Sequence, residues 1–586
     1  MSDAFLGVEN SFSGRRWVAR PYDERMATAL AQRHTLPDIL ARSLSARGID
    51  LDSAPSFLEP RLRDLLPDPS SFKDMDKAAE RLASAIQSGE AIAIYGDYDV
   101  DGATSTALLR RFIRATGAEP RLYIPDRLKE GYGPNADAMR HLAQEGVKLV
   151  ICVDCGTTAH EPLKAAKEAG LDILVLDHHA SEPVLPPAVA IVNPNRLDED
   201  NPYGYLAAVG VSYLFIIAVN RVLRAAGWYS DARKEPDLLQ WLDLVALGTV
   251  CDVVKLTGLN RAFVAQGLRV MGQRRNTGIV SLAQAAGLKG GMDTYAAGFI
   301  LGPRVNAGGR VGRSDLGANL LSTIDGVEAL KLAEQLHQLN AERRTIEAQV
   351  LAEAEAIQLS DNLPMAFVAS ENWHPGVIGI VASRLKDRFH HPALVVALDG
   401  DIGKGSGRSV TGVDLGAAII AARQAGLLLN GGGHKMAAGF TVERSKIDAL
   451  KEFLADRISR QLAAEPLKPT LTVDGLIAST SAQPDFVKQL GKLGPFGTGN
   501  PEPRFAMTDC RIVNANVVGE KHVSVVVMQG GVRIRGIAFR AMEGPLGKAL
   551  LESKGSNYHL AGHLRLDEWQ GVERVQLHIS DAAKIA

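Results

Sequence analysis

The chain has 586 residues, more than one hydrophobic core normally serves, which predicts roughly three to four domains. The same length excludes a small disulfide scaffold, and a composition of 46% hydrophobic and 23% charged residues excludes a disordered or fibrous protein. The formal net charge is -2, so a polyanionic partner must be bound by local basic patches.

Neither a membrane segment nor a secretory signal is predicted. The longest apolar run, residues 206–219, is about 14 residues long and too short to cross a bilayer, so we expect a buried helix. The N-terminal residues lack the basic and apolar segments of a signal peptide, and a cytoplasmic location is the default. Cys152 and Cys155 form a CxxC pair, but no second pair completes a zinc site, so we expect reduced, buried thiols.

The first half of the chain predicts an α/β domain behind an N-terminal cap. Residues 1–70 contain short helical patterns broken by prolines and show no obvious chemistry. Within residues 71–260, apolar runs then alternate with helical patterns, which predicts a parallel sheet covered by helices on both faces. The predicted strands lie within 91–96, 149–154, 172–179 and 188–194. Ligands of such sheets bind beyond the carboxyl ends of the strands.

Three further regions are predicted after this domain. Residues 261–358 form a helical connector that ends in some 30 residues without Gly or Pro, about 45 Å long as a helix. Residues 359–463 predict a second, smaller α/β domain. Residues 464–586 contain five or six short β-rich runs with little helix between them, which predicts an OB-like barrel.

Three carboxylates, Asp97, Asp99 and Asp101, follow the first predicted strand. Ionised carboxylates at this spacing repel one another unless they are protonated or neutralised, and divalent metal is the simplest answer. An EF-hand calcium loop needs glutamate at its twelfth position, which is Leu108 here. A solvated acidic turn is the alternative if the motif stands alone.

Later apolar runs also end in metal-binding residue types. Asp154 closes the second predicted strand, His178 and His179 follow the third, and Asp252 follows a later apolar stretch. Parallel strands bring these side chains to one edge of the sheet, and a mixed oxygen and nitrogen ligand set suits Mn²⁺ or Mg²⁺ better than zinc. Two such ions bridged by a carboxylate recur in phosphoester hydrolysis. A single structural histidine is the alternative for each imidazole.

The ordered motifs DYDVDG, VDCGTT, LDHH and GTVCDVV resemble those of the DHH phosphoesterase superfamily. The later GPRVNAGGR, GSGRS, GGGHKMAAGF and GPFGTGNPEPRF resemble its RecJ branch. The resemblance implies an α/β fold: a parallel-sheet DHH domain, a smaller DHH-associated domain joined by a long helix, and an OB-like barrel.

The resemblance implies a metal-dependent exodeoxyribonuclease. Its expected activity is single-stranded-DNA-specific 5′ to 3′ hydrolysis that releases mononucleotides by a two-metal mechanism, in DNA recombination and repair. Two divalent cations, Mg²⁺ or Mn²⁺, are the implied cofactors. The implied partners are single-stranded DNA, a single-strand-binding protein and a helicase, with no membrane and a monomer as the default.

Residue by residue, the resemblance also implies the metal ligands. They are Asp97, Asp99 and Asp154 for one ion, and Asp101, Asp154, His178 and Asp252 for the other, with Asp154 bridging. Many relatives outside the RecJ branch have histidine where this chain has Tyr95, so Asp97 is the expected substitute. His179 is expected to orient a ligand or to touch the scissile phosphate.

The later motifs supply cations and amides that suit a phosphodiester. Glycine-rich backbone N–H groups can approach phosphate closely, and arginines bind it with two hydrogen bonds. The expected substrate-binding residues are Arg304, Arg310, Ser406, Arg408, Gly432, Gly433 and His434. A flexible turn, for the glycines, and surface salt bridges, for the arginines, are the alternatives when each motif is taken alone.

The predicted barrel offers candidate DNA contacts. Arg533 and Arg535 lie two residues apart and project from the same side of a strand. Phe539 and Trp569 either stack on unpaired bases or belong to the core.

Two alternatives to the exonuclease stay open. One is a DHH-family phosphodiesterase for short RNA or cyclic dinucleotides, although such enzymes are shorter or carry membrane or sensory segments. The other is a non-catalytic DNA-binding scaffold, which should have lost ligand residues that this chain retains. A pyrophosphatase or polyphosphatase is disfavoured because those relatives resemble a different second lobe.

Overall fold

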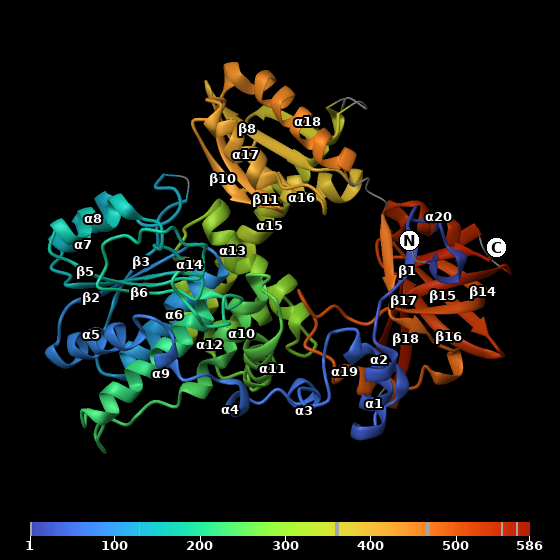
Figure 1. Cartoon of the computed structure of the whole chain (residues 1–586), viewed down its shortest axis with the longest axis horizontal. Coiled ribbons are helices and arrows are strands. Elements are labelled where there is room, and N and C mark those ends of the chain that lie inside the picture. The colour runs from blue at the N-terminus through green and yellow to red at the C-terminus, as the bar shows by residue number, and fades with distance from the viewer. Residues whose placement is uncertain are drawn as a thin grey trace. The chain divides into compact units, whose positions relative to one another are not determined.

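The computed structural model describes residues 3–127, 129–357, 363–464, 469–552, 555–569 and 572–585. The chain forms two compact units. One unit comprises Met1–Leu65, Leu256–Arg261 and Lys468–Ala586, and the other comprises Leu66–Lys255 and Ala262–Leu467. The predicted N-terminal segment and barrel therefore share one unit, and the two predicted α/β domains share the other (Figure 1).

A five-stranded parallel sheet carries the first α/β domain, as predicted. In spatial order its strands are β3 (Arg121–Tyr123), β2 (Ile92–Gly96), β4 (Leu149–Val153), β5 (Asp172–Leu176) and β6 (Ala190–Val192). The central strands β2 and β4 are buried on both faces, which explains their continuous apolar sequences. The sequence pattern misses β3 because its three residues are only partly buried and form no apolar run.

Helices cover both faces of this sheet (Figure 1). On one face, α7 (Ala136–Gln144) and α8 (His160–Glu168) share a core with the strands, which includes Cys152 and Cys155. Both thiols are free and buried, as expected. The other face carries α5 (Met75–Ser88), α6 (Val100–Ala115) and α9 (Ala208–Ala225).

The strand order reverses between β2 and β4. β3 lies on one side of β2, whereas β4, β5 and β6 follow on the other side. At such a switch point, the loops that leave two neighbouring strands run to opposite faces and open a crevice between them. The loops after β2 and β4 are therefore the expected ligand-binding segments.

Helix α9 contains the apolar run that we predicted to be a buried helix. It is longer than the run, because the helix continues through a more polar last turn. Among the described residues it is the one helix whose length and composition would suffice to cross a membrane, and 72% of its residues are buried inside the protein.

Helices connect the two α/β domains. They include α10 (Leu242–Cys251), α11 (Gly258–Gly272), α12 (Thr277–Ala285), the π-helical turn η4 (Ala296–Leu301), α13 (Gly302–Val311) and α14 (Leu316–Ser322). The predicted long helix is α15 (Gly326–Ala356), whose first turn is capped by the carboxylate of Asp325. Val350 and Ala354, near its C-terminal end, belong to a core of the second α/β domain.

A mixed five-stranded sheet forms that second domain. Its order is β10 (Asn430–His434), β11 (Ala437–Glu443), β9 (Ile402–Arg408), β8 (Ala393–Asp399) and β7 (Ala366–Glu371). One face packs on α16 (Ile378–Phe389), and the other packs on α17 (Leu415–Gln424) and α18 (Ile447–Ala464). The glycine triplet lies in β10, paired with β11, and is not a flexible turn.

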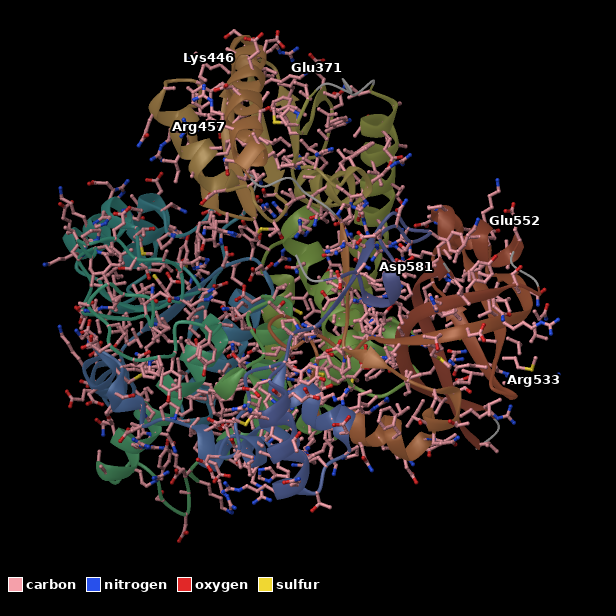
Figure 2. All side chains as sticks on the ribbon, turned by 45° about the vertical axis from the view of Figure 1, so that its right-hand side comes forward. Glu371, Lys446, Arg457, Arg533, Glu552 and Asp581 are labelled. Carbon is pink, nitrogen blue, oxygen red and sulfur yellow. The ribbon has the colours of Figure 1, made fainter. Side chains whose placement is uncertain are left out.

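A closed five-stranded barrel forms the core of the other unit. The ring consists of β14 (Phe505–Val518), β15 (His522–Gln529), β16 (Val532–Ala538), β18 (Val572–Lys584) and β17 (Asn557–Trp569), which pairs again with β14. This confirms the predicted barrel, although β14 and β17 are longer than predicted, at 14 and 13 residues. Arg533 lies on β16 and Asp581 on β18 (Figure 2).

The N-terminal segment is anchored to this barrel unit. Strand β1 (Arg16–Ala19) pairs in parallel with β12 (Thr470–Val473). The buried indole of Trp17 donates a hydrogen bond to Oδ2 of Asp581 at 3.2 Å, and the hydroxyl of Ser11 donates to the same oxygen at 2.6 Å. These contacts satisfy the buried Asp581 carboxylate, so the cap and the barrel stabilise each other.

Candidate metal centre and anion pocket

The loop after β2 brings three carboxylates to the switch point. Asp99 is the N-cap of α6, and its Oδ1 accepts the N–H of Gly102 at 3.1 Å. A Cβ at Gly102 would lie 2.5 Å from the carbonyl oxygen of Asp97, so only glycine permits this close approach. Asp97 and Asp101 are buried. The glycine that follows the acidic motif therefore shapes the loop.

Asp154 leaves β4 in the left-handed region, with φ of 59°. Residues other than glycine seldom adopt this conformation, and such strained positions cluster at functional sites. Asp97, Asp99 and Asp154 each place one carboxylate oxygen within 4.8 Å of the others, a spacing suited to one metal ion.

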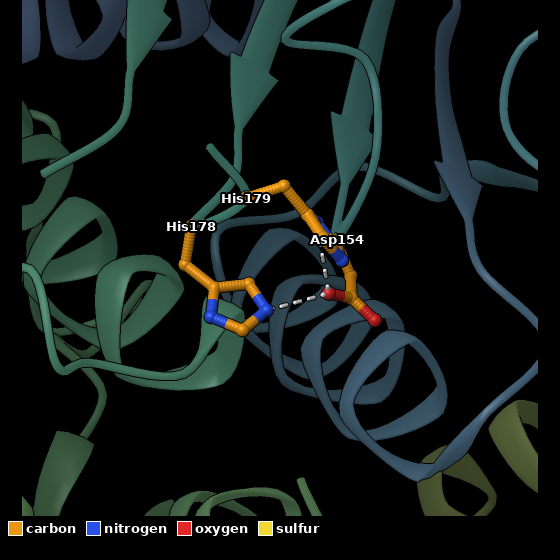
Figure 3. Close-up of side chains that lie close together, drawn as sticks. All are labelled: Asp154, His178 and His179. Atoms are coloured by element: carbon orange, nitrogen blue, oxygen red, sulfur yellow. Dashed lines mark ion pairs between the residues drawn. The ribbon is translucent and has the colours of Figure 1, made fainter. Parts of the chain in front are cut away.

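His178 joins a second group of ligands. Its Nε2 lies 3.3 Å from Oδ1 of Asp154, 3.7 Å from Oδ2 of Asp252 and 3.9 Å from Oδ2 of Asp101 (Figure 3 shows the Asp154 contact). His178, Asp101 and Asp252 present ligand atoms within 4.8 Å of one another. The structure thus brings all six predicted metal ligands together, with Asp154 adjoining both groups.

The two consecutive histidines have opposite charge states. Burial and the neighbouring charge of His179 lower the pKa of His178 to about 4, so its ring is neutral at pH 7 and can bind a metal. Burial also lowers the pKa of His179, but the hydrogen bond and charge of Asp177 outweigh it and raise the pKa to about 9. His179 is therefore a cation at the edge of the site.

Asp177 is a residue of the candidate site that the sequence analysis missed. Its Oδ1 lies 2.7 Å from Nδ1 of His179, and it also accepts the backbone N–H groups of His178 and His179. Burial tends to raise the pKa of Asp177, but the hydrogen bond and charge of the His179 ring, together with the bond from the N–H of Thr157, hold it well below its usual range. The sequence feature that could have identified Asp177 is its position at the end of β5, directly before two histidines.

The metal-free carboxylates resist ionisation. Burial, followed by repulsion from neighbouring carboxylates, raises the pKa of Asp101 to about 7 and that of Asp252 to about 9. The same causes raise the pKa values of Asp97 and Asp154 well above the ordinary range. Within the described residues, Oδ1 of Asp97 and Oδ2 of Asp252 are buried without a hydrogen-bond partner. These orphaned oxygens and the mixed donor set fit divalent cations.

Asp101 differs from the other carboxylates because the protein binds both of its oxygens. They accept the backbone N–H groups of Ala208 at 2.7 Å and Val209 at 2.9 Å, at the first turn of α9. The positive end of that helix stabilises the carboxylate charge. Helix α9 thus positions one predicted ligand.

Two residues of the segment between β3 and α7 were also missed. The hydroxyl of Tyr132 donates to the carbonyl oxygen of Asp154 at 3.2 Å and lies 3.3 Å from Nε2 of His179. The guanidinium of Arg127 lies 4.9 Å from the ring centroid of Tyr98. The local sequence does not identify Arg127 and Tyr132 as site residues, because only the folded topology brings them to the switch point.

A pocket of about 390 Å³ lies beside the metal centre in the same unit. Its lining includes four of the predicted substrate-binding residues, Arg310, Ser406, Arg408 and Gly432, together with Arg127 and Lys404. No acidic side chain is among the described residues that line it. Burial, followed by the charge of Arg127, lowers the pKa of both Arg310 and Arg408. An anion would relieve this repulsion, so the pocket suits a phosphate.

Three predicted substrate-binding residues do not line this pocket. Gly433 and His434 follow Gly432 on β10, and His434 is exposed. Arg304 lies on α13, where it donates to the carbonyl oxygen of Ile300 at 2.6 Å and to Nδ1 of His337 at 3.3 Å.

Helix α13 connects the pocket to the metal-binding loop. Its Arg310 lines the pocket and donates to the carbonyl oxygen of Gly376 at 2.9 Å. A Cβ at the preceding residue, Gly309, would lie 2.9 Å from the Cβ of Tyr98, between Asp97 and Asp99. The pocket and the metal-binding loop are therefore held by adjacent residues of one helix.

The stability of the metal-free protein should fall as pH rises. The folded-state pKa values of Asp101 and Asp252, about 7 and about 9, exceed the ordinary 3.8. Their contribution to stability is therefore complete below the ordinary value and is lost progressively as pH rises from 3.8 to about 7 for Asp101 and to about 9 for Asp252. Saturating Mg²⁺ or Mn²⁺ should remove most of this loss. Thermal unfolding across this pH range, with and without chelator, measures it; parallel curves would contradict the metal centre.

Three domain families match the chain in order. Residues 91–249 match the DHH family, N-terminal domain; residues 362–460 match the DHHA1 domain; and residues 473–581 match the RecJ OB domain. The fold observed above follows the same order, with a parallel-sheet domain, a mixed-sheet domain and a barrel.

Curated relatives cover nearly the whole chain. The single-stranded-DNA-specific exonuclease RecJ of Dickeya dadantii (strain 3937) is 37% identical over 93% of this chain and 96% of its own length. RecJ of Escherichia coli (strain K12) is 35% identical over the same shares. The crystal structure of RecJ in complex with Mn²⁺ from Thermus thermophilus is 29% identical, with a TM-score of 0.80, and covers 97% of this chain and 79% of that chain. The chain belongs to the RecJ family.

Proposed function

We propose that this chain is a metal-dependent exonuclease that degrades single-stranded DNA from its 5′ end and releases mononucleotides. The observation that carries the proposal is the convergence of five carboxylates and His178 at the switch point, beside a pocket rich in arginine. The relatives named single-stranded-DNA-specific exonuclease support the substrate class.

The two groups of ligands fit Mg²⁺ or Mn²⁺. Asp97, Asp99 and Asp154 would hold one ion, and Asp101, His178 and Asp252 the other, with Asp154 shared. When bound, such ions neutralise the carboxylates, make water more acidic and stabilise the leaving oxygen of a phosphodiester. The neutral ring of His178 presents its Nε2 to this site without competing for a proton.

His179 contributes a fixed positive charge. Its Nδ1 is bonded to Asp177, which fixes the tautomer and the ring orientation, so that Nε2–H, 3.3 Å from the hydroxyl of Tyr132, can be shared with a phosphate oxygen. The side chain is 47% exposed, so substrate can reach it. We assign His179 to the binding of the scissile phosphate and Asp177 to the positioning of His179.

The anion pocket fits the 5′-terminal phosphate. A terminal phosphate monoester carries about -1.5 to -2 charge, more than an internal phosphodiester, and so gains more from several guanidinium groups. Arg127, Arg310 and Arg408 supply these groups, and Ser406 supplies a hydroxyl. This preference gives the enzyme its 5′ polarity.

The barrel offers a second DNA-binding face. Arg533 and Arg535 are exposed on β16, and Phe539, just beyond the strand, is 54% exposed with its ring between those of His522 and His578. Phe539 is therefore outside the core, and stacking on a base is worth about 1 to 3 kcal/mol. The side chain of Trp569 lies outside the described residues.

The cellular setting stays a prediction from the family resemblance. It comprises a monomer in the cytoplasm that acts in recombination and repair, together with a single-strand-binding protein and a helicase. The short-RNA or cyclic-dinucleotide phosphodiesterase and the DNA-binding scaffold are the alternatives that the first experiment separates.

Replacing Asp154 with Asn should reduce exonuclease activity by at least about 100-fold, because Asp154 adjoins both groups of ligands. Exposed Asp200, replaced in the same way, is the matched control and should retain activity. Digestion of 5′-labelled and 3′-labelled single strands in parallel should release the 5′ label first. Full activity in Asp154→Asn would refute the metal centre, and preferred cleavage of short RNA or cyclic dinucleotides would favour the alternative enzyme.

The Asp177→Asn variant should shift the alkaline limb of the pH–rate profile to lower pH. Asp177 raises the pKa of His179 to about 9, so its loss lets the ring deprotonate at lower pH, and activity that needs the cation falls earlier. Asp172→Asn, at the other end of β5, is the control. An unchanged profile, with metal affinity also unchanged, would remove His179 from the reaction.

Arg408→Ala should reduce the preference for a 5′-phosphate over a 5′-hydroxyl end. Losing a charge-assisted bond of about 1.5 to 3 kcal/mol predicts a loss of about 10- to 100-fold in apparent affinity for the phosphorylated strand alone. Exposed Arg423, on α17, is the control. Competition assays with the two strand types measure the ratio; equal weakening of both would place Arg408 elsewhere on the DNA path.

A further inference from the structure

Two exposed aromatic rings lie just before helix α13. Tyr295 and Phe299 are 60% and 71% exposed, and their rings stack with centroids 5.3 Å apart and planes inclined by 23°. A stacked aromatic pair left this open to solvent marks a binding surface. We propose that Tyr295 and Phe299 form a stacking platform for unpaired bases of the DNA strand beyond the cleavage site. This inference rests on the proposed function.

The platform is fixed relative to the metal centre. Phe299 lies in the π-helical turn η4, and such turns are frequent at functional sites. A Cβ at Gly298 would lie 3.3 Å from Cγ1 of Val250, and one at Gly302 would lie 2.4 Å from Sγ of Cys251. This close packing holds η4 against the end of α10, directly before the predicted ligand Asp252.

The platform also lies at a defined distance from the anion pocket. η4 runs without a break into α13, so Phe299 and Arg310 are separated by about 16 Å of helix. With the 5′-phosphate beside Arg310, this distance corresponds to about five stacked nucleotides, and fewer if the strand is extended. The bases about three to five nucleotides from the 5′ end are those that reach the rings.

Positive charge beside the rings favours a nucleic acid over an apolar peptide. The guanidinium of Arg304 donates to the carbonyl oxygen of Ile300, the residue after Phe299, and to Nδ1 of His337. Arg344 is exposed and close enough to lower the pKa of Arg304, after the larger effect of burial. Aromatic rings at η4, together with cations on the adjoining α13 and on α15, suit bases and phosphates together. Arg304 does not line the pocket, and on this proposal it contacts backbone phosphates of the DNA near the rings.

The test compares Tyr295→Ala/Phe299→Ala with Tyr295→Phe/Phe299→Tyr, which keeps both rings. Ile324→Ala, at an 82% exposed aliphatic position of the same unit, is the control. Each is made in the full chain with Asp154→Asn, so that the strand is bound without turnover. The probe is a single strand with 2-aminopurine at successive positions from the 5′ end, and circular dichroism checks folding. If the double alanine variant does not fold, Phe299→Ala alone replaces it.

The parent should quench 2-aminopurine most strongly about three to five nucleotides from the 5′ end. The alanine variant should lose this quenching and bind the strand about 5- to 100-fold more weakly, whereas the ring-exchange variant and Ile324→Ala should do neither. With Asp154 restored, the alanine variant should still cleave dinucleotides normally. Unchanged quenching in the alanine variant would overturn the platform, whereas failure of the Asp154-containing parent to cleave any single strand would overturn the proposed function instead.

Discussion

Mutual repulsion among buried carboxylates is the constraint on which the active unit depends. Burial and neighbouring charge raise the pKa values of Asp97, Asp101, Asp154 and Asp252, so the fold keeps together groups that would otherwise separate. Backbone geometry holds them in place: the first turn of α9 binds Asp101, and a left-handed turn orients Asp154. The crowded carboxylates lower the stability of the fold at this edge, and packing elsewhere in the sheet offsets that cost. Bound cations would remove the repulsion.

The same environment gives two neighbouring histidines very different pKa values. His178 and His179 are consecutive, yet one has its pKa lowered to about 4 and the other raised to about 9. The difference arises from Asp177, which bonds to the ring of His179 and leaves His178 facing the carboxylates. Paired titratable groups with divergent pKa values indicate divided roles, which on the proposed function are those of a neutral metal ligand and a cationic phosphate contact.

Local pattern was sufficient to predict the strands that end at the site. The runs before Asp97, Asp154 and His178 are continuous and apolar because their strands are buried on both faces, and parallel topology then brings their ends together. Short β3 escaped prediction because it is partly exposed. The roles of Arg127 and Tyr132 escaped as well, since only tertiary packing gives them partners. Likewise, nothing in the local sequence of residues 1–65 indicates that Trp17 reaches Asp581 on the barrel.

Adjacent residues of α13 relate the pocket to the metal-binding loop, and this proximity bears on product size. Arg310 lines the pocket, while Gly309 packs against Tyr98, between two of the carboxylates. A strand whose terminal phosphate occupies the pocket can therefore present to the metal centre only a phosphodiester close to that end. On the proposed function, release of single nucleotides would follow from the spacing along one helix, and 5′ polarity would follow from the extra charge that the arginines prefer. On the proposed function, one rigid element sets both properties.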